Sequence, residues 1–223
     1  TASANIGTIS QAALTLAATA DTKTYDATTA STGVVNATGL QGSDTVTGSA
    51  QTFDSKNAGS RTLAVAGYTV NDGNSGGNYA VTTQTAAGTI GQKALTLAAT
   101  PDSTTYDAKT ASTGPVNVTG LAGADTVTGQ TQTFDSRNAG SRTLAVTGYT
   151  VNDGNSGGNY TVTTQTAPGT INKAALTLAA TPANRASDGT TASSAPVTVT
   201  GLKGSDTVTG QTQTSDSKNA GSR

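Results

Sequence analysis

The chain contains no cysteine, histidine, methionine or tryptophan, and all thirteen of its acidic residues are aspartates. Without histidine or cysteine it cannot build an ordinary zinc site, a Ser-His or Cys-His nucleophile or a disulfide framework. Only 4% of the 223 residues are aromatic and 11% are charged. We therefore expect a protein that is not an enzyme, with no catalytic or cofactor-binding residues and no cofactor.

Charge and hydropathy also limit the partners. Twelve basic residues are scattered among the thirteen acidic ones, and no basic stripe exists for binding a phosphate backbone. No apolar run approaches the roughly 20 residues that span a bilayer. The first ten residues, TASANIGTIS, are neither basic nor apolar, so we expect any export signal to lie outside this sequence. These features predict no nucleic-acid partner and no membrane insertion, and the lack of cysteine suits an exported chain.

Threonine is abundant, with 48 copies, and its branched β-carbon favours extended structure. In the segment 61–79, RTLAVAGYTVNDGNSGGNY, apolar side chains alternate with small or polar ones at Leu63, Val65, Tyr68 and Val70. This period of two is typical of strands with one buried face. The run 71–78 then breaks the pattern with turn-forming residues. The sequence therefore predicts an all-β protein.

The chain repeats itself every 81 residues. The motif LTLAAT begins at Leu14, Leu95 and Leu176, and the first two copies differ at 17 of 81 positions without insertion or deletion. We divide the chain into a tail of a preceding module (1–13), repeat 1 (14–94), repeat 2 (95–175) and a truncated repeat 3 (176–223). Such copies are typical of a long tandem array.

The ends of the chain fit a piece of a longer array. Residues 1–13 match the end of a module, and the third copy stops at Arg223. Residues 1–13 of a second chain could replace only the last part of what repeat 3 lacks, so full completion by donor-strand exchange is not expected. We expect repeat 3 to expose unpaired strand edges.

Each repeat contains about seven short expected strands with Gly-rich turns between them, which favours a small, Ig-like β-sandwich. A β-grasp module with one short helix is the runner-up, although no segment shows a 3.6-residue apolar stripe. The expected strands of repeat 1 are 14–18, 34–38, 45–51, 61–66, 67–70, 79–83 and 89–90. The expected core is Leu14, Leu16, Tyr25, Val35, Leu40, Val46, Phe53, Leu63, Val65, Val70, Tyr79, Val81 and Ile90.

A module this small gains little stability from its own burial, so neighbouring modules should support it. The connection 89–97, TIGQKALTL, is too short and too apolar for a flexible tether. We expect the last strand of one repeat to run almost straight into the next repeat, giving a stiff rod. In repeat 3, Ser187 and Ser215 replace an aromatic pair of the other copies, Tyr25 with Phe53 and Tyr106 with Phe134. Repeat 3 should therefore be weaker or packed differently.

Four ordered blocks, YDATTAST, TGLQGSDTVTG, FDSKNAGSRTLAV and GGNYAV, resemble the YDG-type repeat and the related MBG repeats of large bacterial surface proteins. The name-giving triplet reads Tyr25-Asp26-Ala27, Tyr106-Asp107-Ala108 and Ser187-Asp188-Gly189. The family's proteins are commonly filamentous-haemagglutinin-like adhesins exported by two-partner secretion. The resemblance implies an extracellular stalk or adhesive fibre at the bacterial cell surface.

A glycine-rich loop offers the strongest pattern for a metal. Its oxygen-bearing residues alternate as in a calcium loop, but it has a single carboxylate, and Thr83 stands where a calcium loop has its twelfth-position acid. We therefore expect a polar turn and no metal site. The weak candidate ligands are Asp72, Asn74 and Asn78 in repeat 1, with Asp153, Asn155 and Asn159 in repeat 2.

Other polar motifs have structural explanations. We expect the recurring aspartates Asp26, Asp107, Asp44 and Asp125 to cap backbone amides in turns. No lysine recurs in both complete repeats, since Lys23, Lys56 and Lys93 align with Thr104, Arg137 and Ala174, so a shared Lys-Asn isopeptide bond is not expected. N-glycosylation motifs begin at Asn36, Asn117 and Asn159, and such motifs are frequent by chance in this composition.

Two functions fit this sequence. The first is a structural shaft repeat of a secreted adhesin or extracellular filament, which gives length and stiffness in cell adhesion or biofilm. Its partners would be neighbouring modules and, through lateral self-association, other fibres. The second is a module that binds exopolysaccharide through polar side chains beside Tyr68 or Tyr79, although both tyrosines also suit a core.

Overall fold

A computed structural model describes residues 7–221, and all of its regular structure is β. No helix occurs in this range, and accordingly none is available there to cross a membrane. The all-β class and the tandem small β modules are confirmed, whereas the β-grasp runner-up, which needs a helix, is not what these residues form. Of the expected tail segment only residues 7–13 are described, and Arg223 also lies outside the described residues.

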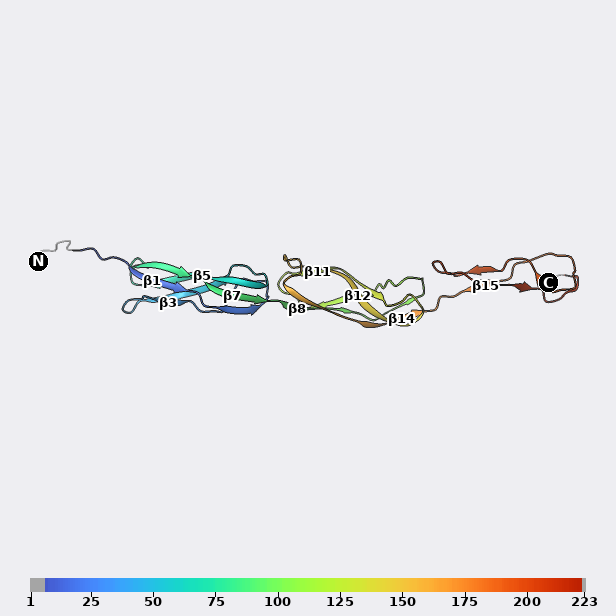
Figure 1. Cartoon of the computed structure of the whole chain (residues 1–223), viewed down its shortest axis with the longest axis horizontal. Helices are drawn as coiled ribbons and strands as arrows, with labels where there is room; N and C mark the ends of the chain where they lie inside the picture. Colours follow the sequence, from blue (N-terminus) through green and yellow to red (C-terminus); the bar gives the residue numbers. More distant parts are fainter. Residues whose placement is uncertain (1–6, 222–223) are drawn as a thin grey trace. The chain divides into compact units, whose positions relative to one another are not determined.

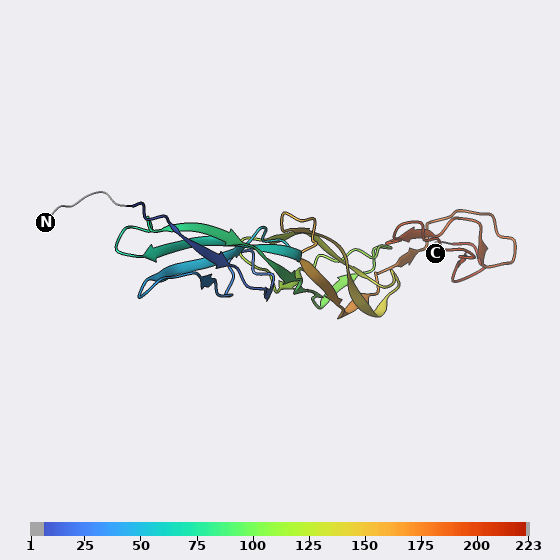
Figure 2. The same ribbon diagram turned by 60° about the vertical axis from the view of Figure 1, so that its left-hand side comes forward.

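Repeat 1 consists of two mixed sheets, whose strands lie side by side in both ribbon views (Figures 1 and 2). The three-stranded sheet has the order β3-β1-β6, with β1 antiparallel to β3 and parallel to β6. The four-stranded sheet has the order β2-β7-β5-β4, and its β2–β7 pair is also parallel. The strands are β1 (Ala12–Ala17), β2 (Asp21–Thr24), β3 (Asn36–Thr38), β4 (Thr45–Phe53), β5 (Gly59–Asn71), β6 (Tyr79–Gln84) and β7 (Ala86–Gly91).

Two strand predictions for repeat 1 were wrong. The expected strands 61–66 and 67–70 are one continuous strand, β5, because Gly67 stays extended and Ala50 of β4 pairs with it. The irregularity lies in β4 instead, where the register shifts next to Gly48, whose φ is 65°. Strand β2 was missed because its sequence, DTKT, has no apolar residue. Its backbone pairing with β7 holds it in the sheet.

The expected core is confirmed at its larger side chains. Leu14, Leu16, Val70 and Tyr79 form one buried cluster, and partly buried valines, alanines and one leucine pack around it. Tyr25, Phe53, Leu63 and Ile90 are also buried. The remaining expected core residues are only partly buried, namely Val35, Leu40, Val46, Val65 and Val81.

The chain forms two compact units. Among the described residues, the first unit comprises 7–97, Val118–Gly129 and Tyr149–Thr163. The second unit comprises Ala98–Asn117, Gln130–Gly148 and 164–221. The first unit thus contains repeat 1 and three segments of repeat 2. The strands of repeat 2 are β8 (Lys93–Ala99), β9 (Asp102–Thr105), β10 (Val116–Thr119), β11 (Thr126–Phe134), β12 (Gly140–Asn152), β13 (Tyr160–Gln165) and β14 (Ala167–Asn172).

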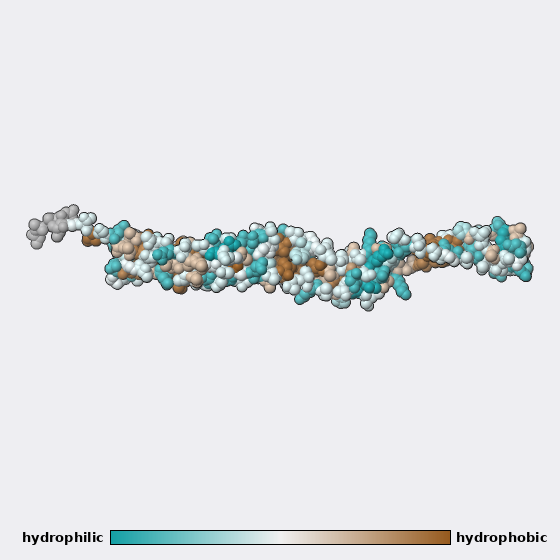
Figure 3. Space-filling model, in the orientation of Figure 1, coloured by the Kyte–Doolittle hydropathy of each residue, from teal (hydrophilic) through white to brown (hydrophobic). Residues whose placement is uncertain are grey.

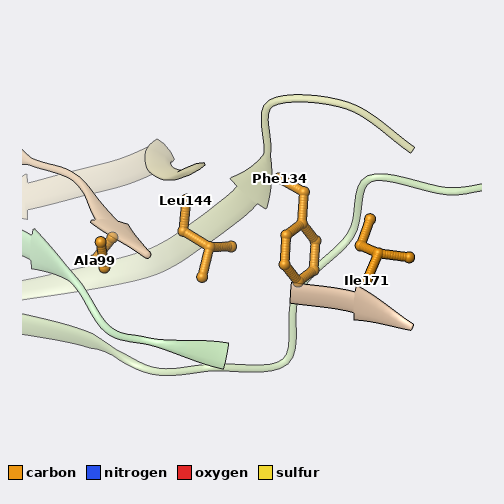
Figure 4. Close-up of a cluster of buried hydrophobic side chains, with 5 residues drawn as sticks. Ala99, Phe134, Leu144 and Ile171 are labelled. Carbon is orange, nitrogen blue, oxygen red and sulfur yellow. The ribbon is translucent and has the colours of Figure 1, made fainter. Parts of the chain in front are cut away.

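The second unit has its own core, in which Phe134, Leu144 and Ile171 pack with Ala99 and Ala167 (Figure 4). Its strand β12 pairs antiparallel with β14, and β14 pairs in parallel with β9, as in repeat 1. The part from repeat 3 holds only short strands in two-stranded sheets. These strands are β15 (Thr177–Ala179), β16 (Ala192–Ser193), β17 (Thr198–Thr200) and β18 (Gln213–Thr214).

Repeat 3 lacks the aromatic packing of the other copies. In place of a buried ring, the Ser187 hydroxyl donates a hydrogen bond to the Lys218 carbonyl oxygen at 3.3 Å. An open cleft of about 420 Å³ lies beside Ser187 and Ser215. The expectation of different packing in repeat 3 is therefore confirmed.

Candidate functional site at the junction between repeats

The connection between repeats 1 and 2 is a single residue. β7 ends at Gly91 and β8 begins at Lys93, so only Gln92 lies outside a strand. The Gln92 side-chain amide donates hydrogen bonds to the carbonyl oxygens of Gly158 and Tyr160, at 3.0 and 3.3 Å. The expected direct passage from one repeat to the next is confirmed, and repeat 2 holds the connecting residue in place.

Two tyrosines from different repeats share one carboxylate at this junction. The hydroxyl groups of Tyr25 and Tyr160 both donate to Oδ2 of Asp125, at 2.9 and 2.7 Å. The two rings meet edge to face, with centroids 5.4 Å apart and planes inclined at 78°. The backbone N–H of Ala122 donates to the Tyr160 hydroxyl at 2.8 Å. Because hydrogen bonds to an ionised acceptor are stronger than neutral ones, this network connects the repeats firmly.

The environment of these phenols opposes their ionisation. Burial first, and then the hydrogen bond to Asp125, raise the pKa of Tyr160 to about 12. The same two causes, in the same order, raise the pKa of Tyr25. Both hydroxyls therefore stay protonated, and able to donate, over the whole physiological pH range.

Asn159 is the second contact between the repeats and is fully buried. Its side-chain oxygen accepts a hydrogen bond from the backbone N–H of Ala58 at 2.8 Å. Its Nδ2 donates a hydrogen bond to Oδ1 of Asn57 at 3.3 Å. Both partners belong to repeat 1. Since a buried amide without hydrogen-bond partners would be costly, Asn159 favours this one arrangement of repeat 2 against repeat 1.

The backbones of the two repeats approach closely at Gly123. A Cβ atom built at this glycine would lie 2.8 Å from the Cβ of Ala27, which excludes a larger residue. Ala27 has a φ of 66°, in the left-handed region that favours glycine. Gly189 occupies the equivalent position of repeat 3 with a φ of 78°, so this backbone conformation explains a glycine as the third residue of the triplet.

The structure places the candidate metal ligands in a loop whose aspartate carboxylate accepts hydrogen bonds from the loop's own backbone. Oδ1 of Asp72 accepts the N–H groups of Asn74 and Gly76, both at 2.8 Å, and Oδ2 accepts that of Asn78 at 3.0 Å. The Asp153 carboxylate accepts the backbone N–H groups of Asn155, Gly157 and Asn159 in the same way. No cluster of three acidic side chains that could hold a metal ion occurs within residues 7–221.

Hydrogen bonds within each loop lower the pKa of both loop carboxylates. Burial acts to raise the pKa of Asp153, but the backbone N–H groups of Gly157, Asn155 and Asn159 together lower it below its ordinary value. The same balance lowers the pKa of Asp72. The loop amides therefore stabilise the carboxylate charge that a cation would otherwise neutralise.

The recurring aspartates divide into two roles. The capping prediction is confirmed for Asp26 and Asp107, whose Oδ1 atoms accept the N–H groups of Thr28 and Lys109, both at 2.9 Å. It is wrong for Asp44 and Asp125, whose carboxylates accept tyrosine hydroxyls instead. Asp44 accepts that of Tyr79 at 2.7 Å within repeat 1. A buried phenol needs an acceptor, and the nearby aspartate provides one.

A glutamine that recurs in all three copies was not among the expected core residues. Gln51 is 1% exposed, and its side-chain amide accepts the N–H of Thr19 and donates to the Thr19 carbonyl, both at 2.8 Å. Gln132 and Gln213 bind the backbones of Thr100 and Thr181 in the same way. The recurrence at a constant spacing of 81 was the signal that could have revealed this structural role.

The remaining candidate residues separate by exposure. Asn159 is buried at the junction, which leaves no room for a glycan, while Asn36 and Asn117 are exposed. Lys23 donates hydrogen bonds to Asp26 and to the Thr28 and Ala30 carbonyls, so it braces a loop without a covalent bond.

The sequence profile of the YDG domain matches residues 10–86 and again residues 91–167. The two matches begin 81 residues apart, in agreement with the repeat period. No curated protein and no solved structure matches the chain.

Proposed function

Because the chain belongs to the YDG domain family, we propose that it is a shaft segment of a secreted bacterial adhesin or extracellular filament. Its repeats supply length and stiffness, and it is not an enzyme. Two-partner secretion and a location at the cell surface are part of this proposal, which the resemblance to filamentous-haemagglutinin-like adhesins supports.

The observation that carries the proposal is the shared carboxylate at the junction. A flexible chain of independent domains would have a polar linker and few side-chain contacts between neighbours. Here the linker is one residue, and Tyr25 of repeat 1 is 1% exposed because it inserts beside Tyr160 of repeat 2. Such contacts between nearest neighbours are what stabilises an array of repeats.

Electron microscopy of single chains tests the mechanical part of this proposal. We expect repeats 1 and 2 to keep one bend angle, whereas a variant with a Gly-Ser insertion after Gln92 should show a broad distribution. The same broad distribution in the unmodified chain would contradict a stiff shaft. Antibody labelling of intact producing cells tests the location separately, since an intracellular protein would remain unlabelled.

Binding of exopolysaccharide is a second candidate function, favoured by two exposed tyrosines. Tyr68 and Tyr149 occupy equivalent positions and are 42% and 41% exposed, whereas Tyr79, the other sequence candidate, belongs to the core. Tyr149 borders an open groove of about 710 Å³ with Asn152, Ser156 and Val162. A glycan array should show binding that Tyr68→Ala and Tyr149→Ala remove together, and uniform absence of binding would exclude this function.

A further inference from the structure

Repeats 1 and 2 each expose one tyrosine on a mostly polar surface. On the face that Figure 3 shows, most of the described surface is white or teal, and brown residues cover only small areas. Within these two repeats the exposed large hydrophobic side chains are Val34, Tyr68 and Tyr149. The two tyrosines lie one period of 81 residues apart, near the ends of β5 and β12. The same aromatic ring therefore recurs at the same place in each repeat.

The exposure of this tyrosine does not depend on the ends of the sequence. The first unit contains repeat 1 together with residues 149–163. Tyr68 thus has part of the following repeat in its unit, and Tyr149 has the preceding repeat, yet the two side chains are 42% and 41% exposed. Neither neighbour covers the ring, so the exposed tyrosine is a property of the repeat itself.

An open groove of about 710 Å³ lies beside Tyr149. Its lining comes from the end of β12, from the loop that follows this strand and from Val162 of β13. Asn152 and Ser156 are exposed polar residues of this lining. The groove thus combines an aromatic ring with an amide and a hydroxyl group, all within one stretch of the first unit.

The side-chain amide of Asn152 has a fixed orientation. Its Nδ2 donates hydrogen bonds to the hydroxyl groups of Thr126 and Thr128 in β11, at 3.4 and 3.0 Å. In repeat 1 the equivalent Asn71 binds the two equivalent threonines of β4, at 3.3 and 3.0 Å. Because these bonds use both N–H groups of the amide, its oxygen Oδ1 is the atom that it offers to a ligand, as an acceptor. The acceptor is oriented before the ligand arrives, which lowers the cost of binding.

The groove has no partner for a charged sugar. Among the described residues that line it none is a lysine or an arginine, so an anionic group would find no cation there. Asp153 is the one charged residue of the lining, and it is 2% exposed. Its carboxylate already accepts three backbone N–H groups of its own loop, so it is not available to a cationic group. The groove therefore favours an uncharged ligand.

We propose that this groove, with its counterpart beside Tyr68 in repeat 1, binds a neutral hexose unit of a polysaccharide. The inference rests on the second candidate function above and narrows its ligand from exopolysaccharide in general to an uncharged one. The tyrosine ring packs against the C–H groups on one face of the sugar, because the face of a phenol is apolar. One sugar hydroxyl donates to Oδ1 of Asn152, and another donates to the hydroxyl oxygen of Ser156.

Titration calorimetry of the intact chain with soluble polymers tests the class of ligand, at about 0.15 M salt to screen non-specific attraction. The neutral probes are dextran, galactan and mannan, the anionic probe is polygalacturonate and the cationic probe is chitosan. At least one neutral polymer should bind, and polygalacturonate should bind about tenfold more weakly. Tighter binding of polygalacturonate or chitosan would overturn this inference but leave the exopolysaccharide function standing. Absence of binding by every polymer would exclude both.

Matched variants separate the ring from the amide. Tyr68→Phe with Tyr149→Phe keeps both rings, so the affinity for the neutral polymer should change by less than about threefold. Asn71→Ala with Asn152→Ala removes the acceptor from both grooves and should weaken binding by about tenfold. Thr147→Ala introduces the residue that repeat 1 has at the equivalent position, outside the groove lining, and should leave the affinity unchanged. Full affinity of the asparagine variant, or equal loss in all three variants, would overturn the inference.

Discussion

The loops Asp72–Asn78 and Asp153–Asn159 have the same seven residues and the same internal hydrogen bonds, yet they differ in burial. In repeat 1 the loop's last residue, Asn78, is exposed, whereas Asn159 and Asp153 are 0% and 2% exposed. The backbone conformation of the loop is therefore local, because the aspartate fixes it from within. The burial comes from the preceding repeat, whose Asn57 and Ala58 contact Asn159.

This difference shows that one sequence serves two purposes in the first unit. Without a neighbour the loop is a polar turn, and with one it becomes an interface. The repeats therefore need no specialised linker. Each copy has one surface that can bury the loop of the following copy, and a loop that the preceding copy can bury. Changes at equivalent residues of the two copies should separate these purposes.

The largest expected difference is between Tyr25→Ala and Tyr106→Ala. Tyr25 is buried against Tyr160, so its loss should destabilise the first unit locally by about 3 to 5 kcal/mol. Tyr106 lines an open cavity of about 350 Å³, and its loss should cost clearly less. Hydrogen exchange in the intact chain would measure both local free energies. Equal costs would show that the ring contact at the first junction adds nothing.

Asn159→Ala and Asn78→Ala form the next pair. Removing Asn159 leaves the buried N–H of Ala58 without its acceptor, at a cost of about 1 to 3 kcal/mol. Asn78 is exposed, and water can replace what its side chain provides. Amide exchange at Ala58 should accelerate in the first variant only. Acceleration in both variants would indicate that the loop, and not the interface, controls this amide.

Alkaline pH should weaken the junction. The pKa of Tyr160 is raised to about 12, so the folded state binds the phenol proton more tightly than the unfolded state, in which it titrates near 10. The stabilisation is complete below pH 10 and is lost as the pH rises from 10 towards 12. Denaturant unfolding at pH 9 to 11.5, with tyrosinate absorbance, would show this loss. The double variant Tyr25→Phe, Tyr160→Phe should show a flatter profile, and parallel profiles would contradict the assignment.

The smallest effect is expected from calcium. At about 10⁻³ M, where extracellular calcium modules bind, it should change neither the melting temperature nor the amide exchange of either loop. The reason is that each loop carboxylate already accepts three backbone N–H groups. Protection of the open loop alone on adding calcium would show that Asp72 can exchange these partners for a cation.

The sequence predicted the fold class because alternation and repetition are local signals. The strands with apolar alternation, such as β1 and β6, were predicted closely. The polar strand β2 was not, because only its pairing with β7 makes it a strand. The Asn71–Asn78 turn followed from its composition.

The junction could not be predicted in this way. Tyr25 and Asp125 lie 100 residues apart, and nothing in either segment indicates that they meet. Asp44 and Asp125 were interpreted as turn caps because sequence shows which groups are near in the chain but not which phenol approaches in space. Burial of Asn159 likewise depends on another repeat, and the identical Asn78 shows that no local signal for it exists.

The parallel pairing of β1 with β6, and of β2 with β7, has a mechanical consequence. The chain enters repeat 1 at the start of β1 and leaves it at the end of β7, so tension along the polypeptide pulls the two members of each parallel pair in opposite directions. The hydrogen bonds of a pair are then loaded in shear, all at once, and not peeled apart one after another. We therefore expect repeat 1 to resist extension along the chain, because many hydrogen bonds would have to break together.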